Sequence, residues 1–340
     1  MHMADALLSP AVGGALWAAS AGTLALCSRR AQTAPEDGRV ALMGVLGAFI
    51  FAAQMINFAI PGTGSSGHLG GGLLLAILLG PHAAFLVVAS ILLVQALLFA
   101  DGGLLALGCN LFNLGLLPCL VAYPLVYRTI AGARPSPRRL WAASVTAALV
   151  ASQTGALGVV LQTSLSGISA LPLTGFALVM LPIHLAIGLT EGVITASVVS
   201  WVRRVRPELF AASPGQGGPA LRKVLVGFVL ATALTAGALS WFASPRPDGL
   251  EWSISQMAED GQLPSPPSGP HPVLAHLQEQ VALLPGYGFS PEGTEPVPPE
   301  EAAWPAVDAG TTLSGLVGGL LTLALAVGTG LLLRRRSASS

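Results

Sequence analysis

The chain has 340 residues, of which 53% are hydrophobic and only 9% are charged, and its mean hydropathy is +0.71. A soluble domain carries roughly 25% charged residues, so the composition excludes an ordinary soluble protein and indicates an all-α polytopic membrane protein. The formal net charge is zero. There is thus no bulk electrostatic attraction to nucleic acid, and no nucleic-acid partner is expected.

Nine apolar segments are predicted to form membrane helices, because several of these runs exceed the roughly 18 residues that mark a membrane span. The third segment is short and rich in glycine, and it is broken at Gly80-Pro81. It is therefore typical of a half-helix or a re-entrant segment, although 69–100 as one long tilted span is an open alternative. The nine segments lie at about 10–27, 40–60, 69–80, 82–100, 104–127, 140–164, 174–202, 223–243 and 312–333.

The chain is predicted to consist of two units. The first, 1–205, holds seven of the nine segments, and a Gly/Pro-rich cytoplasmic linker, 206–221, separates it from the second, 222–340. The second unit has two spans with a long stretch between them, 244–311, that is rich in Pro, Gly, Ser and acidic residues. Such a composition is typical of a loosely ordered loop.

The charges predict the orientation, because cytoplasmic loops collect Lys and Arg near the ends of spans. With the N-terminus outside and seven plus two spans, fifteen of the sixteen basic residues lie in or next to the segments 28–39, 128–139, 203–222 and the C-terminus. The stretch 244–311 holds ten of the sixteen acidic residues. The N-terminus and this loop are therefore predicted to be extracytoplasmic, and the C-terminus cytoplasmic.

The first two residues, Met1 and His2, are a candidate chelate for a metal ion. The Met1 amine and the His2 amide would close a five-membered ring on a metal, and the amide and imidazole Nδ1 of His2 a six-membered ring. No basic segment precedes the first apolar run, so no cleavable signal that would remove this pair is expected. On the predicted topology His68 lies on the same face and would complete a square plane. Such nitrogen sites suit Ni²⁺ or Cu²⁺, and low-spin Co²⁺ less strictly; the alternative is an incidental histidine beside the initiator methionine.

The glycines between Gly62 and Gly72 do not form a nucleotide site. They lack the G-x-x-x-x-G-K-[ST] pattern, and the single lysine, Lys223, is on the cytoplasmic side. No ATPase activity is expected within this chain. Close helix packing through small residues is the better interpretation of these glycines.

Several polar residues at or within the predicted spans have two open interpretations. Asp101 either caps a helix or, with Asn110 and Asn113, orients the metal-binding loop; the asparagines alternatively join helices by hydrogen bonds. His184 and Glu191 lie two turns apart on one helix face and either fix a helix contact or relay protons.

The segment 247–252 begins with a Pro-Asp-Gly turn and continues as an amphipathic stretch. It is either a turn at the end of a span or an element that docks on the metal loop. The three cysteines have no metal-ligand spacing and are interpreted as packing residues.

Several motifs together resemble the CbiM/NikM substrate-binding components of energy-coupling-factor (ECF) transporters for cobalt or nickel. The resemblance covers about 1–205, and Pro247–Glu251 is similar to the PDGLE sequence of the small CbiN/NikN accessory component, here fused to the first unit. Met3 stands where the family usually has isoleucine, and Cys109 where a small residue is common. The motifs are Met1–Met3 with Leu8–Pro10, Ser66–Gly71 leading to Ala76–Pro81, Asp101–Gly103, Leu107–Asn110 and His184–Glu191.

The resemblance implies a seven-helix metal-binding unit followed by a two-helix accessory unit with an extracytoplasmic loop. The implied metal ligands are the Met1 amine, the amide and imidazole of His2, and His68. Residues implied to support them are Ser66, Gly67, Asp101, Asn110 and Asn113.

The expected function is capture of Ni²⁺ or Co²⁺ at the extracytoplasmic face of the inner (plasma) membrane, followed by uptake through an ATP-driven ECF transporter. The expected partners are a transmembrane coupling subunit, cytoplasmic ATPase subunits and membrane lipid; the metal is substrate, and no bound cofactor is expected. Ni²⁺ is slightly favoured because it promotes amide deprotonation better than Co²⁺. Zn²⁺ prefers tetrahedral sites, and Mg²⁺ and Ca²⁺ prefer oxygen. The alternatives are a vitamin-binding ECF component, or an intramembrane enzyme that uses His184 and Glu191.

Overall fold

The computed structural model describes residues 1–31, 37–205, 219–258, 263–264, 266–289 and 304–338, and these ranges form an almost entirely helical protein. The first unit contains η1 (Asp5–Leu7), α1 (Pro10–Ala31), α2 (Asp37–Gln54), α3 (Gly72–Leu79), α4 (Pro81–Leu98), α5 (Leu107–Asn110), η2 (Leu111–Tyr127), α6 (Arg128–Ala131), α7 (Pro137–Ser166) and α8 (Leu173–Val205). The second unit contains α9 (Pro219–Gly237), η4 (Leu239–Phe242), α10 (Gly249–Ser255), α11 (His271–Val281), η5 (Pro285–Tyr287) and α12 (Ala309–Ala338). Two short strands, β1 (Phe58–Ala59) and β2 (Ser66–Gly67), pair in an antiparallel manner.

Within these ranges, six helical segments are long and apolar enough to cross a membrane. The prediction of a polytopic helical membrane protein is confirmed, but three of the nine expected spans, α2, α3 and α9, are not among the six. The helix α3 has only eight residues, and α9 carries Arg222 and Lys223 near its start. The six segments are α1, α4, Leu107–Ala131, α7, α8 and Ala309–Arg334.

The stretch 69–100 forms two helices rather than one. Gly80 separates α3 from α4 with φ +80° and ψ 160°, a backbone conformation that glycine adopts without steric cost, and Pro81 begins α4. The Arg39 guanidinium donates to the Leu79 carbonyl at 2.6 Å, so the end of α3 is satisfied inside the protein. The half-helix that Gly80-Pro81 predicts is therefore present, and nearly all its side chains are buried.

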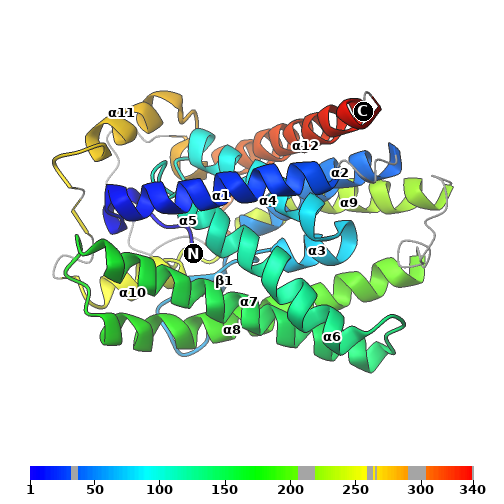
Figure 1. Ribbon diagram of the computed structural model, residues 1–340, viewed down its shortest axis with the longest axis horizontal. Helices are drawn as coiled ribbons and strands as arrows, with labels where there is room; N and C mark the ends of the chain where they lie inside the picture. Colours follow the sequence, from blue (N-terminus) through cyan, green and yellow to red (C-terminus); the bar gives the residue numbers. More distant parts are fainter. Residues whose placement is uncertain (32–36, 206–218, 259–262, 265, 290–303, 339–340) are drawn as a thin grey trace.

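The N-terminal segment passes into the helical bundle instead of lying at its surface, and Figure 1 shows the N-terminus in the middle of the molecule. Met3, Leu7 and Leu8 are all at most 1% exposed. Burial of three apolar side chains within six residues anchors the segment through the hydrophobic effect. This anchoring brings Met1 and His2 toward the loop that contains His68.

Candidate metal centre

The backbone beside His2 is held by a clamp from Asn110. The Met3 amide donates to Asn110 Oδ1 at 2.8 Å, and Asn110 Nδ2 donates to the Met3 carbonyl at 3.2 Å. The same carbonyl accepts from the Gly103 amide at 2.9 Å, and Asp5 Oδ1 accepts from the Ala106 amide at 2.8 Å. These contacts fix the position of the chain two residues from the terminal amine. Asn110 therefore holds the N-terminal segment, a role beyond the hydrogen bonding between helices that was the alternative interpretation.

The terminal amine and two imidazoles converge although 67 residues separate them in the sequence. The Met1 nitrogen lies 3.3 Å from His68 Nε2, and the rings of His2 and His68 are stacked with centroids 5.2 Å apart. His68 Nδ1 lies 3.2 Å from the Leu69 carbonyl. Since a carbonyl only accepts, Nδ1 carries the proton and the Nε2 lone pair faces the amine.

The electrostatics of the site favour neutral imidazoles. Burial and the adjacent Met1 ammonium lower the pKa of His68 below its ordinary value of 6.5. Burial also lowers the pKa of His2, although the nearby Asp101 carboxylate partly opposes this effect. Both rings are therefore uncharged at neutral pH, as metal ligation requires.

His2 engages Asp101 in this structure. His2 Nδ1 lies 3.3 Å from Asp101 Oδ1, and Asp101 Oδ2 accepts from the Tyr287 hydroxyl at 2.5 Å. His2 Nε2 is buried and has no hydrogen-bond partner in the part of the chain that is described. Chelation through Nδ1 thus requires this nitrogen to exchange Asp101 for the metal. Asp101 holds the ring of His2 rather than capping a helix.

The segment that begins at Pro247 docks on the loop of His68. The Ser66 amide donates to the Pro247 carbonyl at 2.8 Å, and the Ser66 hydroxyl donates to the Arg246 carbonyl at 2.8 Å. Asp248 Oδ2 accepts from the Met1 ammonium at 2.5 Å, and the Asp248 side chain also caps α10. Of the two interpretations of this segment, the docking element is confirmed.

Asp248 is a residue that the sequence analysis did not assign to the site. Burial by itself raises the pKa of the Asp248 carboxyl, but the Met1 ammonium and His68 outweigh that effect and hold the pKa below its usual range. The sequence offered one indication of this role, because Asp248 lies in a Pro-Asp-Gly turn that is predicted to be on the same side of the membrane as the N-terminus. Nothing in the sequence indicated which cation it would meet.

Two other expected support residues, Gly67 and Asn113, contact neighbouring helices. A Cβ at Gly67 would lie 2.4 Å from the Ile187 side chain, so only glycine lets this loop approach α8 so closely. Asn113 and Gln162 exchange hydrogen bonds of 2.8 and 3.0 Å, and Asn113 Nδ2 lies 3.7 Å from Met3 Sδ. Asn113 therefore joins helices and supports the Met3 side chain, not the loop of His68.

Glu191 and His184 hold different partners. The Glu191 carboxylate accepts from the amides of Gly70 and Gly71 at 3.3 and 2.9 Å. His184 Nδ1 lies 2.8 Å from the Met180 carbonyl, while the Ser152 hydroxyl donates to the His184 carbonyl at 2.6 Å. No hydrogen bond between His184 and Glu191 occurs in the described ranges, so the structure gives no support to a direct proton relay between them. The loop contact of Glu191 was missed because a loop amide carries no sequence signal.

The remaining donor groups do not form a second cluster. In the described ranges, no group of three or more His, Cys, Asp or Glu side chains is placed to hold a metal ion. Cys27, Cys109 and Cys119 are buried and unpaired, in agreement with their interpretation as packing residues. The site is distinctive in that its predicted donors are two imidazoles and two main-chain nitrogens.

Comparison with known proteins gives two family matches. The family described as "Cobalt uptake substrate-specific transmembrane region" (CbiM) matches residues 2–209, and the PDGLE domain matches residues 222–335. A putative fused nickel transport protein NikMN of Archaeoglobus fulgidus is 32% identical over 332 residues, which cover 96% of each chain.

Other relatives cover the first unit. A cobalt transport protein CbiM of Sorangium cellulosum is 32% identical over 216 residues, 62% of this chain and 94% of that protein. A solved structure titled as a transition metal transporter matches with a TM-score of 0.53 and 29% identity, over 60% of this chain and 93% of that one. These matches identify a transporter component and not an enzyme. The chain therefore belongs to the CbiM family of cobalt and nickel uptake substrate components, with a PDGLE domain fused behind the transmembrane region.

Proposed function

We propose that this protein captures Ni²⁺ or Co²⁺ at the extracytoplasmic face of the plasma membrane and passes the ion on through an ATP-driven ECF transporter. The ligands are the Met1 amine, the His2 amide and imidazole, and the His68 imidazole. One observation carries the proposal: the Met1 nitrogen lies 3.3 Å from His68 Nε2, although the two residues are 67 positions apart in the sequence. Four nitrogens in a plane suit Ni²⁺ best among the metals of this family, with Co²⁺ next.

The arrangement around the ligands supports a charged cargo. When the metal displaces the ammonium proton and the His2 amide proton, Asp248 and Asp101 remain beside the site as carboxylates that offset the charge of the ion. The inner cavity next to the site, lined by Met1, His68 and Asp248 among others, measures about 30 Å³. Pockets for organic ligands of vitamin size measure roughly 300–1,000 Å³, so the cavity argues against the vitamin-binding alternative.

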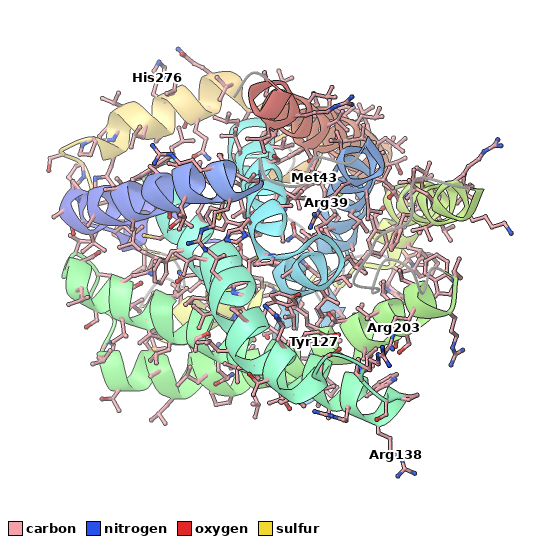
Figure 2. The ribbon with its side chains drawn as sticks, turned by 45° about the vertical axis from the view of Figure 1, so that its right-hand side comes forward. Arg39, Met43, Tyr127, Arg138, Arg203 and His276 are labelled. Atoms are coloured by element: carbon pink, nitrogen blue, oxygen red, sulfur yellow. The ribbon has the colours of Figure 1, made fainter. Side chains whose placement is uncertain are left out.

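The proposed topology has seven helices in the binding unit (1–205) and two in the accessory unit (222–340), with the N-terminus outside. Figure 2 shows His276, from the expected outer loop 244–311, at the opposite end of the molecule from Arg138 and Arg203. This separation agrees with a basic cytoplasmic end and an opposite, outer end. A transmembrane coupling subunit and cytoplasmic ATPases would supply the energy, and membrane lipid would surround the spans.

The first test is a titration of the purified protein, with its native N-terminus, with Ni²⁺ and with Co²⁺. A yellow square-planar Ni²⁺ absorption band is expected in the unsubstituted protein. In His68→Ala the band should be lost and the affinity should fall by at least about 100-fold, because loss of a ligand exceeds the roughly 10–100-fold effect of an outer-shell contact. His276→Ala is a matched control, since His276 is exposed and its imidazole contacts Gln280 of its own helix. Equal binding by His68→Ala would contradict the ligand set.

The pH dependence of binding reports which nitrogens lose protons. His68 is already neutral because burial and the Met1 ammonium lower its pKa, so it contributes no proton in the neutral range. The amide proton of His2 must leave at every pH, and the amine proton also leaves wherever the amine is protonated. The Ni²⁺ affinity should therefore fall by at least about tenfold for each unit of decreasing pH, measured by absorbance between pH 8 and 6. An affinity that does not change with pH would exclude the amide as a ligand.

A further inference from the structure

The inner cavity extends from the metal centre into the space between the helices. Its lining includes Met1, His68 and Asp248 and also His184 and Glu191, which are both on α8. Seven residues of α-helix span about 10 Å, so the two α8 side chains line different depths. The cavity thus connects the predicted chelate with two donors inside the bundle.

His184 presents a lone pair that nothing in the described ranges uses. The residue is 1% exposed, and its Nδ1 donates to the Met180 carbonyl at 2.8 Å, so Nε2 carries no proton. Nε2 is buried without a hydrogen-bond partner. A buried acceptor without a partner destabilises the fold, and this lone pair is available to a cation in the cavity.

The PDGLE segment closes the cavity beside this ring. A Cβ at Gly249 would lie 3.0 Å from His184 Cε1 and 2.8 Å from Ile183, so only glycine leaves the imidazole edge in place. Gly249 directly follows Asp248, whose carboxylate binds the Met1 ammonium. The His184 ring therefore lies next to the residue that joins the accessory unit to the N-terminus.

The side chains of the lining include groups that bind cations. Among the described lining residues are Asp248 and Glu191, and none is Lys or Arg; the Met1 ammonium also lines the cavity and is paired with Asp248. The Glu191 carboxylate accepts from two loop amides but has further lone pairs available. Imidazole and carboxylate are each ligands of divalent transition metal ions, and the volume of about 30 Å³ suits an ion with little hydration.

We propose that His184 Nε2, and the Glu191 carboxylate at a different depth of the same cavity, are successive transit contacts for the divalent cation that leaves the N-terminal chelate. This inference rests on the proposed function. Each contact offers fewer donors than the chelate, so it holds the ion more weakly. Weak intermediate binding is what passage requires, because an ion must be able to leave each site it enters.

The test uses the full chain assembled with its coupling and ATPase subunits, and compares uptake of radioactive Ni²⁺ with Ni²⁺ titration of the purified chain. In His184→Phe the square-planar band and the affinity should stay unchanged, while uptake falls by about tenfold or more, the size of effect that follows loss of a contact to a metal. His184→Cys retains a metal ligand and should recover a substantial part of the uptake. Thr195→Val is the matched control, because Thr195 is a buried α8 residue whose hydroxyl also has no partner among the described residues, and it should transport normally.

Three outcomes would overturn the inference while the proposed function stands: normal uptake by His184→Phe, equal loss of uptake in His184→Cys and His184→Phe, or loss of uptake in Thr195→Val. Loss of the Ni²⁺ band in His184→Phe would also overturn it, since His184 would then belong to the chelate or its support. If His184→Phe does not fold, the comparison of His184→Cys with His184→Gln, a weaker metal ligand, decides between the same outcomes. Absence of the band from the unsubstituted protein would contradict the proposed function itself.

Discussion

Acetylation of the Met1 amine should abolish Ni²⁺ binding, with an affinity loss of at least about 100-fold, beyond the effect of an outer-shell contact. An acetylated nitrogen no longer provides the amine that closes the five-membered ring. It also loses the positive charge that Asp248 binds at 2.5 Å, which leaves a partly buried carboxylate without its cationic partner. The effect is measured by Ni²⁺ titration of the full-length protein after mass spectrometry has located the acetyl group.

A lysine variant provides the control for this experiment, because it removes the second amine that could be acetylated. The single lysine of the chain, Lys223, is the other amine that the reagent can modify, and Lys223→Arg removes that second target. Protein loaded with Ni²⁺ before treatment should resist acetylation at Met1, because the metal occupies the lone pair of the amine. Full Ni²⁺ affinity in protein that is acetylated at Met1 would show that the amine is not a ligand.

Asn110→Leu should weaken Ni²⁺ binding by about 10–100-fold, the range found when a residue that orients a ligand is lost. Asn110 holds both the amide and the carbonyl of Met3, the residue next to His2. Without it the buried Met3 amide is left without a partner, at a cost of about 1–3 kcal/mol, while the Met3 carbonyl keeps its bond from the Gly103 amide; the chelating residues lose their fixed register. The affinity is measured by absorbance titration, together with the thermal stability of the purified protein.

Gln153→Leu is the matched control for Asn110→Leu. The Gln153 side chain also donates to a main-chain carbonyl, that of Leu181, at 2.9 Å, but this bond joins α7 to α8 and does not involve the N-terminal segment. Its loss should reduce stability without changing Ni²⁺ affinity. Equal losses of affinity in the two variants would mean that Asn110 acts only through general stability.

The sequence alone determined the features that depend on composition and on neighbouring residues. The apolar runs predicted a helical membrane protein, and Gly80-Pro81 predicted the break between α3 and α4 because both residues restrict the local backbone. Met1-His2 indicated a chelate because the ring sizes follow from adjacent atoms. Each of these properties is decided within a few residues of chain.

Only the tertiary structure decided which distant groups meet. Asp248 binds an ammonium 247 residues away, Glu191 holds the amides behind His68, and Asp101 binds the ring of His2. The helices α2, α3 and α9 also differ in length from the hydrophobic runs that predicted them. Side-chain contacts of this kind depend on how helices pack across the bundle, and hydropathy or spacing along the chain carries no information about the partner that a buried charge will find.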